Sequence, residues 1–120
     1  MKKLAVLITS PPYSNLSVTA LNYIETALKA DIEIIGVFFY QDAVLHANNQ
    51  VAIASDEFQA KNHWQTLQQS YQIPLYLCIT AADKRGLSDE QPTNINPIFT
   101  VTGLGELVEL SNKADRLVQL

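Results

Sequence analysis

The sequence contains little of what several common functional sites require. It has one cysteine, two histidines and four glycines among 120 residues. A single cysteine cannot form an internal disulfide, which fits a reducing compartment, and two histidines are too few for a histidine-rich metal site. The first predicted loop carries Pro11 and Pro12, which lack the N–H groups needed to hold a phosphate. We therefore exclude nucleotide and flavin binding at that loop.

Cationic residues and long apolar runs are also scarce. There are 8 Lys and Arg against 12 Asp and Glu, and no basic cluster is longer than Lys84-Arg85. A direct nucleic-acid binder usually carries a basic stripe that neutralises phosphates. Apolar runs such as residues 34–40 are far shorter than the roughly 20 residues that cross a bilayer, and residues 4–8 are too short for a signal peptide. We expect a cytoplasmic protein that contacts neither nucleic acid nor membrane directly.

What the chain does contain is enough apolar sequence, 48%, to build a core, and its length favours one domain over residues 1–120. Strands alternate with helices, which predicts an α/β fold with a mainly parallel sheet. The expected strands are residues 4–9, 32–40, 75–79, 98–101 and 116–120, and the expected helices are 16–29, 42–48, 55–71 and 105–112, with 86–97 mostly loop. We expect a flavodoxin-like or Rossmann-like three-layer sandwich of about five strands, with helices on both faces.

A flavodoxin-like strand order, 2-1-3-4-5, would place the first and third strands side by side. The sheet reverses its direction of growth there, and ligands or chemistry sit at the carboxyl ends of the strands. The loop after the first strand contains Tyr13, and the third strand ends near Cys78. This order therefore predicts that Cys78 lies beside Tyr13.

Cys78 is the candidate catalytic residue. The nucleophilic form is the thiolate, and a free cysteine has a pKa near 8.5. The stretch Thr80-Ala81-Ala82-Asp83 has the form of a capping box, so a helical turn beginning at Thr80 would aim unpaired N–H groups at the sulfur. Lys84 and Arg85 could add positive charge. Such a thiolate can accept sulfur as a persulfide and pass it on, with no metal or other cofactor. The alternative is a packed, inert cysteine, since free cysteine is often buried.

The other candidates have simpler interpretations. His63 is interpreted as a solvated helix residue, whereas His46 could either be structural or line a cleft. Asp56 and Glu57 would open the helix expected at 55–71, where acids favour the helix dipole. The hydroxyls of Ser10 and Ser14 are interpreted as loop and capping groups.

Several short motifs, in their order and spacing around one cysteine, resemble the TusD/DsrE family of sulfur-relay proteins, and most closely its TusD subunits. The resemblance runs essentially from end to end. The motifs are Pro12-Tyr13, Val37-Phe38-Phe39-Tyr40, Ala54-Ser55-Asp56-Glu57-Phe58, Cys78 with Ala81-Ala82 and Arg85-Gly86, Thr102-Gly103-Leu104-Gly105-Glu106-Leu107 and Asp115-Arg116-Leu117-Val118-Gln119.

The resemblance implies a cytoplasmic sulfurtransferase subunit. Cys78 would take persulfide sulfur from a TusA-like carrier and pass it to a TusE-like protein, for 2-thiolation of the wobble uridine in transfer RNA. TusB-like and TusC-like paralogues would complete a heterohexamer, arranged as a dimer of heterotrimers. Two alternatives remain: DsrE-like sulfur trafficking in dissimilatory sulfur oxidation, and a non-catalytic scaffold subunit in which Cys78 is merely packed.

The sequence departs from the family pattern in two loops. Ser10 and Ser14 stand where the family often has the glycines of a Gly-Pro-x-Tyr-Gly loop. The loop at residues 87–97 is shorter than in the family, which bears on partner choice if that loop contacts a partner.

Overall fold

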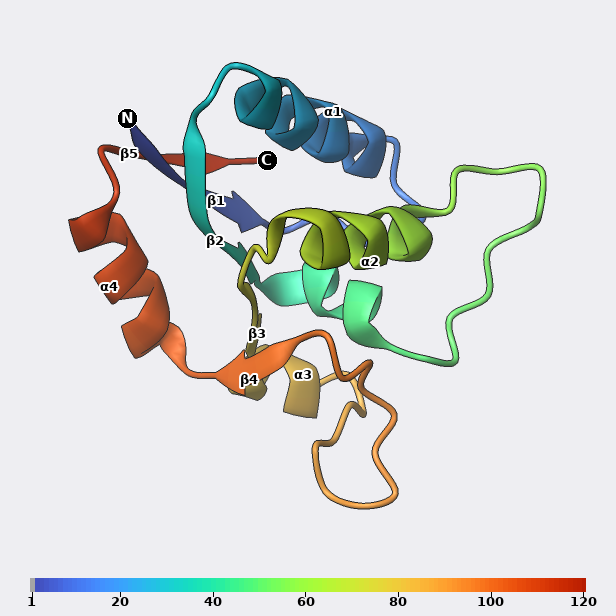
Figure 1. Cartoon of the computed structure of the whole chain (residues 1–120). Helices are drawn as coiled ribbons and strands as arrows, with labels where there is room; N and C mark the ends of the chain where they lie inside the picture. Colours follow the sequence, from blue (N-terminus) through green and yellow to red (C-terminus); the bar gives the residue numbers. More distant parts are fainter. Residues whose placement is uncertain (1) are drawn as a thin grey trace.

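A computed structural model of the chain describes residues 2–120 and shows strands alternating with helices (Figure 1). The elements, in chain order, are β1 (Lys3–Ile8), α1 (Leu16–Lys29), β2 (Glu33–Phe39), the 3-10 helix η1 (Gln41–Ala47), α2 (Ala60–Tyr71), β3 (Leu75–Cys78), α3 (Ile79–Asp83), β4 (Thr100–Thr102), α4 (Leu104–Lys113) and β5 (Arg116–Gln119). In residues 2–120, no helix combines the length and apolar character that crossing a bilayer requires.

The five strands form one sheet in the order β4-β3-β2-β1-β5, and every pairing is parallel. Helices α1 and α2 cover one face of this sheet, and α4 packs against the other face (Figure 1). The predicted α/β class and three-layer arrangement are therefore confirmed.

The predicted strand order, 2-1-3-4-5, is wrong. The chain steps from β1 through β2 and β3 to β4 in one direction, and only α4 carries it back to the far side of β1. Because parallel crossovers are right-handed, the return step places α4 on the opposite face from α1 and α2. Strand β2 therefore separates β1 from β3, and the predicted reason for Cys78 to lie beside Tyr13 is lost. Tyr13 lies in the loop after β1 and is 63% exposed.

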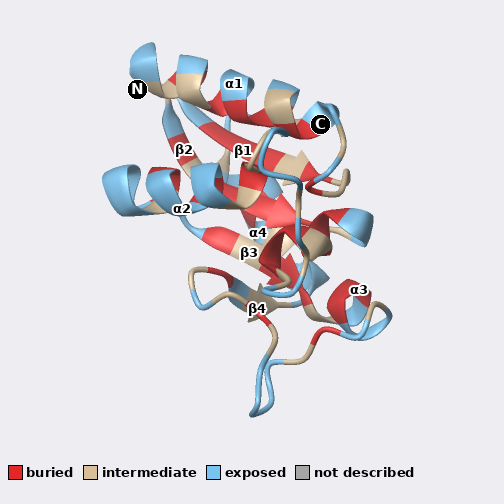
Figure 2. Cartoon of the chain, turned by 90° about the vertical axis from the view of Figure 1, so that its right-hand side faces the viewer, coloured by how far each residue is buried: buried red, intermediate tan, exposed pale blue. Residues whose placement is uncertain are grey.

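The core is built around β2, the central strand. Its residues Val37, Phe38 and Phe39 are fully buried, as expected for a strand covered on both faces. Helix α1 spans the predicted residues and turns Leu21 and Ile24 toward the sheet. Figure 2 shows the same division, with buried residues along the strands and exposed residues on the outer sides of the helices. Burying each of these large side chains contributes about 1.5–3 kcal/mol.

Helix α2 begins at Ala60, five residues later than predicted, so Asp56 and Glu57 do not open it. The Gln59 side-chain amide explains the late start, since it donates hydrogen bonds to the carbonyls of Ile53, Ala54 and Glu57. These bonds occupy backbone acceptors without helical geometry, so local side-chain bonding competes with the helix here. The acidic pair lies in an exposed turn instead.

Candidate functional site

Cys78 is the last residue of β3 and also the N-cap of the short helix α3. Its backbone is still extended, with φ −71° and ψ 119°, and the helical turn starts at Ile79. The predicted capping box is therefore wrong, because Thr80 lies inside the turn and no side chain caps α3. The sequence placed the turn one residue too late, and the structure puts the thiol on the capping residue itself.

The thiol is buried. Only 1% of Cys78 is exposed, and Ala81 and Ala82 of the following turn are buried with it. The residue also pairs with Thr102 of β4 across the sheet. The structure around Cys78 must therefore open locally before a reagent or a protein can reach this sulfur.

A small hollow of about 200 Å³ lies at the carboxyl ends of β2 and β3, next to Cys78 in the chain. Its lining is mostly polar and consists of Tyr40, Gln41, Thr80, Ala81, Lys84 and Arg85. Sequence reasoning missed Tyr40 and Gln41. The sequence did show that both residues directly follow β2. They were missed because the predicted strand order placed the third strand next to the first, whereas it lies next to the second.

The charge beside the cysteine differs from the prediction. Arg85 Nε donates to Asp42 Oδ1 at 2.9 Å, and Arg85 Nη1 donates to the Ala81 carbonyl at 3.0 Å. The Asp42 carboxylate partly neutralises the guanidinium, and the pair joins η1 to α3. Within residues 2–120, Lys84 forms no ion pair, so it is the uncompensated cation of the hollow.

His46 does not line a cleft. It is fully buried, and its Nδ1 accepts a hydrogen bond from Trp64 Nε1 at 3.0 Å. Its Nε2 donates to the carbonyl of Ser10, also at 3.0 Å. Burial lowers the pKa of His46 from 6.5 to about 4, and the Ser10 hydrogen bond opposes that change only in part. His46 is thus a neutral core residue that joins η1 to α2 and to the loop after β1.

His63 and Ser14 behave as predicted. His63 is exposed on α2, where its ring stacks on Phe58 with centroids 4.5 Å apart. Ser14 Oγ accepts a hydrogen bond from the N–H of Leu16 at the start of α1. In the part of the chain that the structure describes, no group of three His, Cys, Asp or Glu side chains could hold a metal ion.

Comparisons with known proteins agree with one another. The DsrE/DsrF-like family model matches residues 2–120. A "Sulfurtransferase TusD" from Klebsiella pneumoniae is 36% identical over 98% of this chain and 98% of its own length. A "Sulfurtransferase TusD homolog" from Haemophilus influenzae is 35% identical over 96% of this chain and 97% of its own. The crystal structure of the ychN protein from E. coli superposes with a TM-score of 0.77 at 21% identity, covering all of both chains, which shows a shared fold.

Proposed function

Because the chain belongs to the DsrE/DsrF-like family and is TusD-like, we propose that it is a sulfurtransferase that carries persulfide sulfur on Cys78. The observation that carries this proposal is the position of the chain's single cysteine. Cys78 stands at the carboxyl end of β3. In open parallel sheets, ligands bind outside the carboxyl ends of the strands. The TusD relatives, matched over nearly their full length, supply the type of reaction.

The proposed step is an exchange at sulfur. The Cys78 thiolate attacks the terminal sulfur of a donor persulfide, and a new S–S bond forms at Cys78. The donor's S–S bond breaks, and the donor leaves as a thiolate that keeps the electron pair. No net oxidation occurs, so the step needs no redox cofactor. Lys84 lines the adjacent hollow and forms no ion pair within residues 2–120, so it is the proposed source of positive charge for the thiolate.

The place of this step in a pathway follows from the TusD likeness. The proposed donor is a TusA-like carrier and the proposed acceptor is a TusE-like protein, with the sulfur destined for the wobble uridine of transfer RNA. TusB-like and TusC-like paralogues are the proposed partners in a heterohexamer. The acidic net charge of −4 supports a relay protein that does not itself hold RNA.

Burial of the thiol favours a second candidate, a non-catalytic interaction subunit. With 1% of Cys78 exposed, the residue has the environment of an ordinary packed cysteine. The two candidates differ in whether sulfur ever appears on Cys78.

Intact-mass spectrometry after incubation with a persulfide-loaded carrier tests the proposal. We expect wild-type protein to gain the mass of one sulfur atom, reversibly with reductant, and Cys78→Ser to gain none. The Ser variant keeps nearly the same volume, so circular dichroism should show an unchanged fold.

The same incubation is then repeated with the paralogue subunits present, because the buried thiol could open only in a complex. Sulfur on Cys78 in either experiment supports the relay. If a donor confirmed to be loaded leaves Cys78 unmodified in both, the interaction-subunit candidate replaces it.

A further inference from the structure

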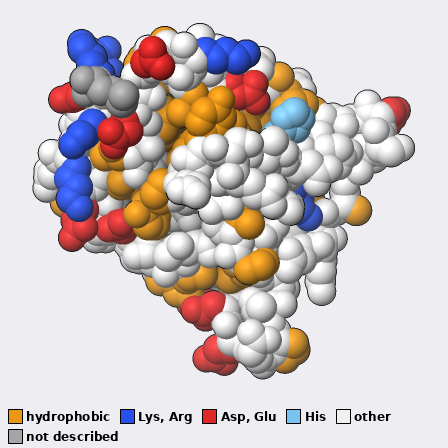
Figure 3. All heavy atoms as spheres, viewed as in Figure 1, with side chains coloured by type: hydrophobic (Ala, Val, Ile, Leu, Met, Phe, Trp, Pro, Cys, Tyr) orange, Lys and Arg blue, Asp and Glu red, His pale blue; other side chains and the backbone are white. Residues whose placement is uncertain are grey.

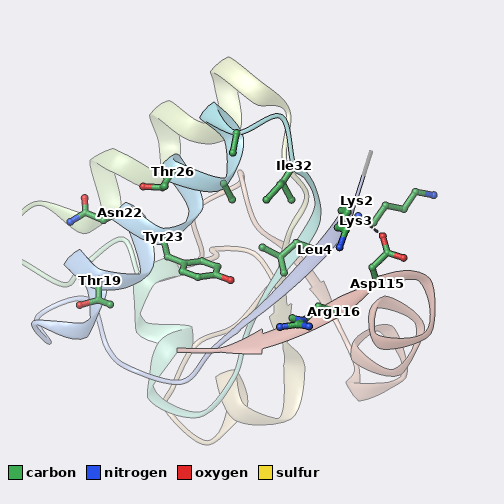
Figure 4. A pocket seen from close by; sticks show the side chains of 12 residues that line it. Lys2, Lys3, Leu4, Thr19, Asn22, Tyr23, Thr26, Ile32, Asp115 and Arg116 are labelled. Carbon is green, nitrogen blue, oxygen red and sulfur yellow. Dashed lines mark hydrogen bonds between the residues drawn. The ribbon is translucent and has the colours of Figure 1, made fainter.

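Access to Cys78 does not run through the larger hollow of the molecule. That hollow is a groove of about 800 Å³ between α1 and the edge where β1 pairs with β5 (Figure 4). All its lining residues belong to residues 2–32 and 115–116, so β3 and α3 contribute nothing to it. The route to the buried thiol is therefore to be found at the smaller hollow, next to Cys78 in the chain.

The smaller hollow, of about 200 Å³, is a seam between two short elements. Residues 40–41, at the start of η1, line one side. The other side is lined by residues of α3 and of the turn after it, Thr80, Ala81, Lys84 and Arg85. Because α3 begins directly after Cys78, movement of α3 away from η1 would widen this seam toward the sulfur.

On the seam, η1 is the firmly held side. Its residues Ala43, Val44 and His46 are fully buried. The His46 ring is hydrogen-bonded to Trp64 of α2 and to the Ser10 carbonyl after β1. The 3-10 helix is thus attached to two other parts of the fold, and it provides a fixed support beside α3.

Helix α3 has little apolar anchorage. It is five residues long, and its buried side chains, Ala81 and Ala82, are small. Hydrophobic stabilisation grows with the apolar area buried, so two alanines hold this turn weakly. Segments with few buried apolar contacts open most easily. Between Cys78 and Leu87, which are both 1% exposed, polar contacts therefore carry a large share of the attachment.

Arg85 supplies polar contacts that join the two sides of the seam. Its Nε donates to Asp42 Oδ1 of η1, and its Nη1 donates to the Ala81 carbonyl of α3. One planar guanidinium thus holds a carboxylate and a backbone carbonyl at once, a geometry that lysine does not offer. Because the Asp42 side chain is 58% exposed, water can replace this contact, so the link is reversible.

We propose that Arg85 is a positioning residue that latches α3 onto η1 and so sets how often Cys78 opens to a sulfur donor. The closed latch keeps the thiol, and a persulfide formed on it, away from other thiols that would exchange with it. The inference rests on the proposed function for the identity of the visiting molecule. Control of access itself can be measured without any sulfur donor.

Alkylation of the native protein by iodoacetamide, followed by mass spectrometry, measures how often the thiol opens. Arg85→Ala removes both bonds and should raise the rate about tenfold, and Asp42→Ala removes one and should raise it about threefold. The direction is informative, because losing a cation that only stabilised the thiolate would slow alkylation. Lys84→Ala is the matched control: Lys84 forms no ion pair within residues 2–120, so its loss should not accelerate the reaction.

The double variant tests whether the two residues act through one contact. Once Arg85 is absent, Asp42→Ala has no bond left to break, so the double variant should react no faster than Arg85→Ala alone. A second ion pair serves as control. Glu109→Ala removes the contact between Glu109 and Lys113 in α4 and should keep the wild-type rate. Figure 3 shows side chains of both charges along the left edge, where Figure 1 places α4.

Leu21→Ala separates opening of α3 from unfolding of the whole chain. Leu21 is buried on α1, so its truncation should lower the urea midpoint. It leaves the contacts of α3 intact, so native alkylation should keep the wild-type rate. Circular dichroism of each variant checks that the fold is retained.

The proposal is overturned if Arg85→Ala reacts at or below the wild-type rate, or if the effects of Arg85→Ala and Asp42→Ala multiply in the double variant. It is also overturned if Leu21→Ala accelerates alkylation as much as Arg85→Ala. Sulfur loading from a persulfide carrier is measured separately on the same variants. Faster alkylation without sulfur on Cys78 supports the latch and rejects the proposed function, whereas loading with unchanged alkylation does the reverse.

Discussion

His46 is a buried histidine whose two ring nitrogens both take part in hydrogen bonds, one as acceptor from Trp64 and one as donor to Ser10. This pattern requires the neutral ring with its proton on Nε2. A second proton would leave Nδ1 facing the indole N–H as donor against donor, in a site without solvent. The lowered pKa of about 4 reflects that burial.

The His46 environment predicts a loss of stability in mild acid. The folded-state pKa lies below the ordinary 6.5, so the unfolded chain takes up this proton first as the pH falls. The contribution of the neutral His46 ring to the free energy of unfolding is fully present above the unfolded-state pKa and is lost as the pH drops toward 4. Between pH 7 and pH 5 we expect this residue to lower the free energy of unfolding by about 2 kcal/mol. Urea denaturation at the two pH values measures it.

The control for this experiment is the other histidine. In His46→Gln the pH-dependent loss over this range should shrink, whereas His63→Gln, which alters an exposed ring, should keep the wild-type loss. Equal pH dependence in all three proteins would show that His46 does not carry the effect.

At the scale of elements, the packing of α4 depends on a missing side chain. A Cβ built on Gly36 of β2 would lie 2.9 Å from Leu110 Cδ2 and 3.0 Å from Tyr76 Cε2. Leu110 is the one buried residue of α4. Glycine at this position therefore lets the return helix sit close against the central strand.

Gly36→Val should push α4 away from the sheet and lower the free energy of unfolding by about 2–3 kcal/mol, because the core is overpacked. Thermal or urea unfolding measures the change. Gly105→Val makes the same chemical change in α4 where nothing lies within 4 Å, and should shift stability by no more than about 0.5 kcal/mol. Similar losses in both variants would mean that close packing at Gly36 is unimportant.

Local sequence patterns predicted where helices and strands occur better than they predicted which elements lie side by side. Helix α1 matched its predicted bounds because apolar spacing and polar start residues agree there. The start of α2 was missed because the Gln59 side chain bonds the preceding backbone, which periodicity does not reveal. Strand order depends on the side of the sheet on which each crossover connection places the next strand. It also decides whether Tyr40 and Gln41 lie close to the end of β3. That choice is made by long-range packing, so the prediction of Cys78 beside Tyr13 failed while the strand-end position of Cys78 held.

At the scale of the whole molecule, the reactivity of Cys78 measures how easily the sheet edge opens. The thiol is 1% exposed, yet it adjoins β4, a three-residue edge strand, and the five-residue helix α3. Short edge elements open more easily than a central strand.

We therefore expect iodoacetamide to modify native Cys78 at least about tenfold more slowly than the denatured chain. Low urea should raise the rate before global unfolding begins, because opening is local. Mass spectrometry during alkylation, with circular dichroism alongside, measures both. A native rate equal to the denatured rate would contradict the burial, and a rate that rises only with global unfolding would contradict local opening.

The pairing of β1 with β5 also has a consequence for the order of assembly. Leu4 pairs with Arg116 and Val6 with Val118, so β1 shares an edge with β5, which is made more than 100 residues later. During synthesis, β1 can pair with β2 early, but its other edge has no partner until residues 116–119 leave the ribosome. The hydrogen bond from the backbone N–H of Lys3 to the Asp115 carboxylate cannot form before then either. The nascent chain thus carries an open edge on β1 until β5 has been made, and the four residues of β5 then close that edge.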